Sequence, residues 1–160
     1  NIIFNDFKIG DIVELEGPMG DELVIDDSAE KILFIGNGIG ITPFIGLSKE
    51  ALMKNPSIKD VKLLDGQRYE DEFLYKSYFE SLDEKEKKFQ YIPVVSRDKT
   101  SSIRKGYVTH VLEDMDLEGY KVYICGSKNM IVDSYNILLD RGVKKEDIFY
   151  ESEERISIKN

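Results

Sequence analysis

The chain has 160 residues, of which 41% are hydrophobic and 11% aromatic, and it carries a formal net charge of -9. These values are typical of one globular domain, or of one domain with part of another. The acidic balance argues against nucleic-acid binding, because phosphate contacts need clustered Lys and Arg. One cysteine, Cys125, and one histidine, His110, leave no disulfide and no convincing metal-ligand set. No apolar run reaches the roughly 20 residues of a membrane span and no leader is present, so we expect a soluble, cytoplasmic protein.

Residues 1–26 differ in pattern from the rest of the chain. Two short runs of rough apolar alternation, 9–15 and 23–25, are separated by Gly17, Pro18 and Gly20, a pattern that predicts a β-hairpin. An isolated hairpin is marginal in water. We therefore expect it to dock on the following domain or to be the end of a preceding one.

From Lys31 onward, strand-like and helix-like segments alternate at intervals of about thirty residues, the length of a βαβ unit. Apolar runs predict strands that begin near Lys31, Val61, Phe89, Lys121 and Asp147. Helical spacing predicts helices over 43–52, 73–82, 107–115 and 128–142, the last ended by Gly142. In the second of these helices Leu74, Tyr78 and Leu82 lie four residues apart, which predicts that they share one face. The predicted fold is α/β: a five-stranded parallel sheet with helices on both faces, preceded by the hairpin. In such folds ligands bind at the carboxyl ends of the strands, near the topological switch point.

The clearest candidate for a binding site follows the first predicted strand. Three glycines at alternate positions, Gly36, Gly38 and Gly40, lead into Thr42, a candidate N-cap, and Pro43 at the first helical position. Glycines allow main-chain N–H groups to approach a ligand, and a helix N-terminus favours an anion. This order favours a phosphate. The pattern is not the GxGxxG dinucleotide fingerprint, and a plain glycine-rich turn between strand and helix is the alternative.

Cationic and hydroxyl side chains gather in the segments that follow the second and third predicted strands. Their chemistry suits a phosphate monoester, and a tyrosine ring can stack on a base. The residues are Arg68 after the second strand, and Ser96, Arg97, Arg104, Lys105 and Tyr107 after the third. A solvated basic loop is the alternative interpretation.

Two further residues end the last two strands. Cys125, followed by Gly126, ends a buried-looking strand, and an isolated cysteine there is more often a small core residue than a functional one. A nucleophilic role needs a histidine base, and His110 is expected on the surface of a helix. Glu151 follows the last strand, where acidic residues are usually solvated.

Taken together, these segments resemble the nicotinamide-nucleotide domain of the ferredoxin-NADP reductase family. The resemblance covers about residues 30–153 and rests on GIGITPF at 38–44, GQRYEDEFLY at 66–75, VVSRD at 94–98, KGYVT at 105–109, YICGSKNM at 123–130 and YE at 150–151. Upstream, FKIGDIVELEGPMG is similar to the end of that family's flavin-binding barrel. The resemblance therefore implies two parts: 1–28, a fragment of the flavin-binding barrel, and 29–160, the NAD(P)-binding domain.

The resemblance also implies a role for each candidate residue. The segment facing the pyrophosphate comprises Gly36, Asn37, Gly38, Ile39, Gly40, Ile41, Thr42 and Pro43. Ser96 and Arg97 grip the adenosine 2′-phosphate with Lys105 or Arg104, Tyr107 lies near the adenine and Arg68 is nearby. Cys125 and Gly126 lie beside the nicotinamide, Met130 belongs to the same segment, and Glu151 orders the hydride-transfer site. The cysteine is then a positioning residue at the catalytic site.

On this basis we expect a module that holds NADPH for hydride transfer to or from an FAD bound by the missing barrel, with ferredoxin, flavodoxin or another redox protein beyond it. NADH is the less favoured cofactor, because Asp65 lies farther from the glycine turn than the usual ribose-binding carboxylate. Two alternatives are a nucleotide-binding regulatory or electron-transfer subunit without turnover of its own, and a flavodoxin-like domain for another phosphate ligand.

Overall fold

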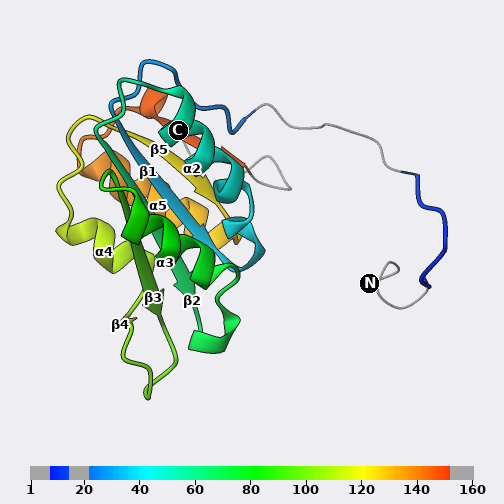
Figure 1. Ribbon diagram of the computed structural model, residues 1–160. Coiled ribbons are helices and arrows are strands. Elements are labelled where there is room, and N and C mark those ends of the chain that lie inside the picture. The colour runs from blue at the N-terminus through cyan, green and yellow to red at the C-terminus, as the bar shows by residue number, and fades with distance from the viewer. Residues whose placement is uncertain (1–7, 15–21, 152–160) are drawn as a thin grey trace.

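A computed structural model describes residues 8–14 and 22–151. A parallel sheet lies between two layers of helices (Figure 1). The strands are β1 (Lys31–Asn37), β2 (Asp60–Gln67), β3 (Phe89–Val95), β4 (Arg104–Lys105), β5 (Tyr120–Cys125) and β6 (Ile148–Glu151). The helices are α2 (Pro43–Lys54), α3 (Lys76–Lys85), α4 (Val108–Asp114) and α5 (Lys128–Asp140), with short 3-10 turns η1 (Gly38–Ile41), η2 (Glu70–Glu72) and η3 (Lys145–Asp147).

The sheet has the strand order β4-β3-β2-β1-β5-β6, and every pair in it is parallel. The chain moves outward from β1 through β4, then returns to place β5 on the other side of β1. The strand order therefore reverses between β1 and β5. In an open parallel sheet this switch point is where a ligand reaches the carboxyl ends of two strands at once.

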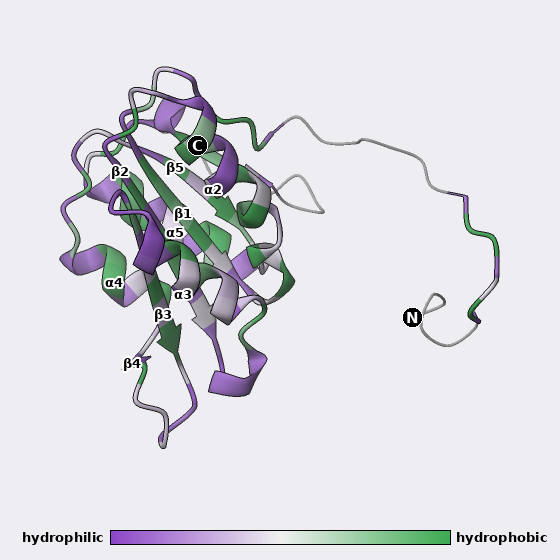
Figure 2. Ribbon diagram, viewed as in Figure 1, coloured by the Kyte–Doolittle hydropathy of each residue, from purple (hydrophilic) through white to green (hydrophobic). Residues whose placement is uncertain are grey.

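Helices cover both faces of the sheet, which confirms the predicted α/β fold. On one face Phe44 of α2 and Phe79 of α3 pack on Phe34 and its neighbours; on the other, α4 and α5 supply Leu112 and Ile131. The middle of β1 is fully buried because both of its faces are covered. Figure 2 shows the hydrophobic colour concentrated in the central strands and hydrophilic residues in the helices and loops around them.

All five predicted strands are present, and the structure adds a sixth. β4 has two residues, which pair with Val94 and Val95 at the outer side of β3. A strand this short shows no periodicity that a sequence pattern could reveal. The four predicted helices are also present, and Gly142, at φ +84°, follows the end of α5 as predicted.

The predicted buried face of α3 is wrong in part. We expected Leu74, Tyr78 and Leu82 to share it, but Leu74 is exposed and Tyr78 is at the surface, while Phe79 is fully buried. The helix begins only at Lys76, so its apolar face is rotated. Phe79 stacks on Tyr91 with ring centroids 5.5 Å apart, and this contact decides which side of the helix faces the sheet.

The predicted N-terminal hairpin is not seen in the part of the chain that the structure describes. Residues 8–14 contain a turn and no strand, and residues 22–30 contain none either. The predicted turn residues Gly17, Pro18 and Gly20 lie outside the described residues. Among the helices of the described ranges, none is long and apolar enough to cross a membrane.

Candidate nucleotide-binding site

The glycine loop after β1 fits directly against the end of β5. A Cβ atom on Gly40 would overlap the carbonyl oxygen of Cys125 and lie 2.5 Å from the Cα of Gly126. Both obstacles are backbone atoms, so no side chain can be accommodated at position 40. Gly38, at φ +55°, faces the other way, and a Cβ there would meet nothing within 4 Å. The loop is therefore packed on its inner side and open on its outer side.

A pair of hydrogen bonds joins the same two strand ends. The side chain of Asn37 accepts a hydrogen bond from the Ser127 N–H at 2.8 Å and donates one to the Ser127 hydroxyl at 2.9 Å. Gly126, at φ +151°, permits this approach, because a Cβ at that position would overlap the side-chain oxygen of Asn37. Asn37 and Gly126, both predicted cofactor-binding residues, thus hold the loops after β1 and β5 together.

Several residues of the predicted pyrophosphate segment have structural contacts of their own. Gly36 is buried in β1, where a Cβ would lie 3.0 Å from the Phe44 ring. Ile41 is fully buried in the core, whereas Ile39 is 81% exposed. Pro43 begins α2 as predicted. Thr42 occupies the N-cap position of α2, as predicted, but its hydroxyl makes no capping bond to the helix, because it donates to the Ile39 carbonyl oxygen at 2.7 Å.

A buried polar cluster, which was not predicted from the sequence, lies beneath the loop. The Gly38 N–H donates to the side-chain oxygen of Gln67 at 3.3 Å, and the Gln67 amide donates to one oxygen of Asp65 at 2.9 Å. The Tyr91 hydroxyl donates to the other oxygen at 2.8 Å. The detectable signal was the alternation of β2, DVKLLDGQ, which puts Asp65 and Gln67 on the same buried side as Leu63.

Burial dominates the electrostatics of this cluster. Asp65 is fully enclosed, and its desolvation raises the pKa of the carboxyl to about 6, although the bonds from Tyr91 and Gln67 oppose the shift. Desolvation and the adjacent carboxylate raise the pKa of Tyr91, so its hydroxyl remains a donor. Because Asp65 has both oxygens engaged and no exposure, it is not available to bind a ribose.

Two predicted cations lie side by side at the ends of β2 and β3. The backbone N–H groups of Arg97 and Asp98 donate to the carbonyl oxygen of Arg68 at 2.9 and 3.0 Å, and the Ser96 N–H donates to that of Gln67. Both arginine side chains are exposed, and neither makes an ion pair within the described residues. The structure thus brings Arg68, Ser96 and Arg97 together, as predicted from the sequence.

Two other predicted phosphate ligands already have partners. Arg104 pairs with Asp114 at 3.2 Å, and the Lys105 ammonium donates to the carbonyl oxygens of Asp98 and Ser101 at 2.7 and 2.5 Å. Lys105 therefore closes the loop after β3. Tyr107 is 56% exposed and available for stacking.

Carboxylates lie close to Arg97 at the ends of β2 and β3. A shallow pocket at this end is lined by Arg97 and by acidic side chains that include Glu70, Glu72 and Asp98. Hydrogen bonds from Thr100 and Ser101 hold the pKa of Asp98 down to about 2, so it is ionised. The Glu72 carboxylate accepts bonds from the Arg68 and Tyr69 N–H groups. These acids organise the loop backbone beside the cations.

The predicted catalytic pair is adjacent at the other end of the site. Cys125 and Glu151 are partners in the β5–β6 register. Burial, and then the Glu151 charge, raise the pKa of the thiol to about 11, so Cys125 is a neutral thiol rather than a nucleophile. Met130 is buried beneath Gly126, where a Cβ would lie 2.7 Å from its methyl group. It supports the loop from the core side.

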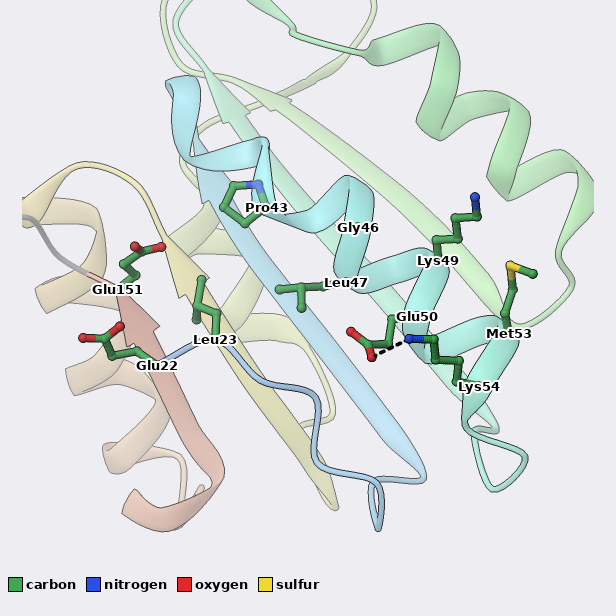
Figure 3. Close-up of a pocket in the computed structure, with 10 residues that line it drawn as sticks. All are labelled: Glu22, Leu23, Pro43, Gly46, Leu47, Lys49, Glu50, Met53, Lys54 and Glu151. Atoms are coloured by element: carbon green, nitrogen blue, oxygen red, sulfur yellow. Dashed lines mark hydrogen bonds and ion pairs between the residues drawn. The ribbon is translucent and has the colours of Figure 1, made fainter. Parts of the chain in front are cut away.

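A cavity of about 630 Å³ opens beside Glu151 (Figure 3). Glu22 and Leu23 from the N-terminal segment and Glu151 from β6 form one side, and α2 forms the other with Leu47, Met53 and the ion-paired Glu50 and Lys54. Leu23 and Leu47 lie opposite each other in the middle of the view. This cavity was not predicted from the sequence. No group of His, Cys, Asp and Glu within the described ranges could hold a metal ion.

Comparison with known proteins agrees with this geometry. Residues 34–135 match the family described as the oxidoreductase NAD-binding domain. The chain is 32% identical over 152 residues to CDP-6-deoxy-L-threo-D-glycero-4-hexulose-3-dehydrase reductase of Yersinia pestis, covering 93% of this chain and 45% of that protein. It is 29% identical over 155 residues to the reductase component of phenol 2-monooxygenase of Pseudomonas sp. (strain CF600), covering 93% and 44%.

A solved structure, the Amycolatopsis cytochrome P450 reductase, superposes with a TM-score of 0.83 at 28% identity, covering 94% of this chain and 46% of that chain. The chain therefore spans less than half the length of each of these three proteins.

Proposed function

Because the chain belongs to the oxidoreductase NAD-binding domain family, as its resemblance to the ferredoxin-NADP reductases predicted, we propose that it holds NADPH for hydride transfer to or from FAD in a longer reductase. The observation that carries this proposal is the pairing, on one sheet edge, of an open glycine loop with two exposed arginines that lack ion-pair partners among the described residues. One feature suits the pyrophosphate and the other suits the adenosine phosphate.

The glycine loop supplies the pyrophosphate seat in this proposal. Its outer surface at Gly38 is open, its inner surface is fixed by the Gly40 contact with Cys125, and α2 begins directly behind it. Backbone N–H groups at such a helix start favour an anion. The predicted residues Asn37, Ile41 and Pro43 then act by shaping the loop, and the exposed Ile39 lies on its ligand side.

The 2′-phosphate is assigned to Arg97, with Arg68 and Ser96 beside it. A guanidinium binds a phosphate monoester by charge-assisted hydrogen bonds. This assignment supports NADPH over NADH, and the enclosure of Asp65 supports it further, because no carboxylate at that position can reach ribose hydroxyls. Tyr107 offers its ring to the adenine.

The nicotinamide end is assigned to Cys125, Gly126 and Glu151. A neutral thiol beside a glycine gives a small, flat surface that orients a ring without reacting with it. When both cofactors are bound, the nicotinamide and the flavin exchange the hydride, and the protein supplies orientation. We place the flavin-binding domain against the cavity in Figure 3, because Glu22 and Leu23, which line it, lead in from the segment 1–28 that resembles the end of a flavin-binding barrel.

Beyond the flavin we propose a redox protein as partner. The similar proteins are named as reductases that serve a dehydrase, a phenol 2-monooxygenase and a cytochrome P450. Ferredoxin and flavodoxin are the acceptors that we expect for this chain, in the cytoplasm. A regulatory or electron-transfer subunit without turnover of its own is the second candidate.

The deciding experiment is calorimetric titration of the chain with NADPH, NADH and 2′-phospho-AMP. We expect 2′-phospho-AMP and NADPH to bind and NADH to bind more weakly. Equal affinity for NADPH and NADH, with no binding of 2′-phospho-AMP, would contradict the phosphate assignment. Fusion to a flavin-binding domain and a diaphorase assay then separate the reductase from the regulatory subunit, since only the reductase turns over.

A further inference from the structure

A buried acid, Asp65, lies beneath the glycine loop after β1, and it is not among the residues that we propose contact the nucleotide. Asp65 is fully enclosed on the α2 and α3 side of β2, and its two oxygens accept hydrogen bonds from Tyr91 and Gln67. Burying a carboxylate is costly, as the raised pKa of Asp65 shows. An apolar residue at position 65 would avoid this cost. It could also be accommodated there, because the neighbouring Leu63 and Leu64 show that β2 holds leucine on both of its faces.

Gln67 connects this acid to both ends of the nucleotide site. Its side-chain oxygen accepts from the Gly38 N–H at 3.3 Å, and its backbone oxygen accepts from the Ser96 N–H at 2.9 Å. The amide of glutamine has one accepting and one donating end. Only the orientation with the NH₂ toward Asp65 leaves the oxygen toward Gly38.

We propose that Asp65 is a positioning residue for the nucleotide loop: its carboxylate, which only accepts hydrogen bonds, fixes the orientation of the Gln67 amide, and Gln67 thereby holds the Gly38 N–H and the geometry of the loop. This inference rests on the proposed pyrophosphate seat. It adds a residue that determines affinity without contacting the ligand.

The charge state of Asp65 decides how strongly the orientation is held. A carboxylate receives a charge-assisted bond from the Gln67 amide, and such bonds are about twice as strong as neutral ones. A protonated carboxyl offers a neutral bond and carries a donor of its own, so the reversed amide, with its NH₂ against the Gly38 N–H, becomes accessible. Protonation of Asp65 therefore loosens the loop.

No cation competes for this role among the described residues around the cluster. The titratable group of β3 that faces the cluster is Tyr91. Those of α3 are Glu80, which is paired with Lys76 at 2.7 Å, and Asp83, whose carboxylate accepts a hydrogen bond from the Tyr91 N–H at 3.0 Å. From β1 and η1 the neighbours are the glycines at 36 and 38, which carry no charge. Burial is the cause that raises the pKa of Asp65, and the hydrogen bonds from Tyr91 and Gln67 oppose it.

The first test uses nuclear magnetic resonance of the chain without nucleotide. We expect the amide signals of Gly38 and of the Gln67 side chain to titrate with the same midpoint, near pH 6, as the Asp65 carboxyl carbon. Tyr91→Phe removes a donor that stabilises the carboxylate, so all three midpoints should move to higher pH. A Gly38 amide that does not respond while Asp65 titrates would overturn the proposal.

The second test measures the affinity for ADP-ribose, which has the pyrophosphate but no phosphate monoester that titrates near pH 6. Wild-type affinity should fall roughly fivefold between pH 7.5 and pH 5, the difference between a charge-assisted and a neutral hydrogen bond. Asp65→Asn should remove this pH dependence. His110→Gln is the matched control and should retain it, since histidine is the other side chain that commonly changes charge in this range.

The outcomes separate the two proposals. If ADP-ribose binds but Asp65→Asn keeps the wild-type pH profile, the positioning role is wrong and the nucleotide site stands. If ADP-ribose does not bind at any pH, the pyrophosphate seat is wrong and the inference falls with it. If Gly38 and Asp65 titrate together in the free chain, the coupling between them holds whatever ligand the loop receives.

Discussion

The two ends of the proposed nucleotide site are built in opposite ways. At the β1–β5 end, backbone meets backbone: Gly40 fits against Cys125, and Asn37 binds Ser127 through two hydrogen bonds. At the β2–β3 end, the groups that we propose face the ligand are the exposed side chains of Arg68 and Arg97. The first end is fixed before any ligand arrives, whereas the second must order long side chains when the ligand binds.

This difference suggests how specificity is divided. A rigid backbone loop suits the pyrophosphate that every nicotinamide dinucleotide carries, and preorganisation lowers the entropic cost of binding it. Exposed side chains suit the part that distinguishes NADPH from NADH, since they can be exchanged without disturbing the sheet. Changes at the loop should therefore damage the fold and all nucleotide binding together, and changes at the arginines should alter selectivity alone.

The largest effect is expected at the packed end, from Gly40→Ala. The new methyl group would overlap with backbone atoms of residues 125 and 126, and neither strand end can move without disturbing β1 and β5. Overpacking typically costs about 1–3 kcal/mol, and a backbone obstacle places this site at the upper limit or beyond. Urea unfolding should show that the free energy of unfolding of Gly40→Ala is lower than that of the wild type by at least about 3 kcal/mol.

Gly46→Ala is the matched control for this substitution. Gly46 lies inside α2, where a Cβ would meet nothing within 4 Å. Alanine in a helix interior is favoured over glycine by roughly 1 kcal/mol, so this variant should be more stable than the wild type. Equal stabilities for the two alanine variants would show that the glycine loop is not tightly packed and would remove the contrast between the two ends.

The next effect concerns the buried acid that supports the loop. The pKa of Asp65 rises from 3.8 in the unfolded chain to about 6 in the folded chain, so the folded state retains a proton that the unfolded state has lost between these values. Stability from this group is thus complete below pH 3.8 and declines as the pH rises to 6, by about 3 kcal/mol. Between pH 4 and pH 7, the stability of Asp65→Asn relative to the wild type should therefore rise by about 3 kcal/mol.

Asp98 gives the opposite sign and serves as the comparison. Its pKa is lowered to about 2 by hydrogen bonds from Thr100 and Ser101, so its contribution is present above the unfolded value and is lost as the pH falls toward 2. Asp98→Asn should therefore lose stability relative to the wild type at pH 7 and recover it in acid. Thermal unfolding at a series of pH values measures both variants. The same slope for both would contradict the burial of Asp65.

The sequence was informative where a local pattern carries the structure. The run of buried residues in β1, the three glycines and Pro43 together indicate strand, turn and helix, because each depends on its neighbours in the chain. The grouping of Arg68 with Arg97 also followed from the order of strands, since parallel strands end at one edge. The two-residue strand β4 was missed because it exists only through its pairing with β3.

The parts that could not be predicted depend on contacts distant in the chain. Phe79 rather than Tyr78 faces the sheet because of its stacking on Tyr91. The roles of Asp65 and Gln67 depend on which residues of η1 and β3 lie over them, which no spacing reveals. Lys105 looked like a phosphate ligand by composition, yet its ammonium binds two carbonyl oxygens of its own loop.

The smallest change in the free energy of unfolding, and the largest change in selectivity between NADPH and NADH, is expected at the β2–β3 end. Arg97→Ala should weaken NADPH binding by roughly ten- to a hundredfold, the value of a charge-assisted bond to a phosphate, and leave NADH affinity nearly unchanged. Arg104→Ala is the control, because Arg104 is paired with the exposed Asp114 and such surface pairs contribute little. Calorimetry with both nucleotides measures the ratio of NADPH affinity to NADH affinity for each variant.

An equal loss of affinity for NADPH and NADH in Arg97→Ala would place the arginine on the pyrophosphate, and selectivity would then have to reside elsewhere. An unchanged fold in this variant, seen in its unfolding curve, completes the contrast with the loop, since a side chain that extends into solvent can be removed without altering the strand that carries it.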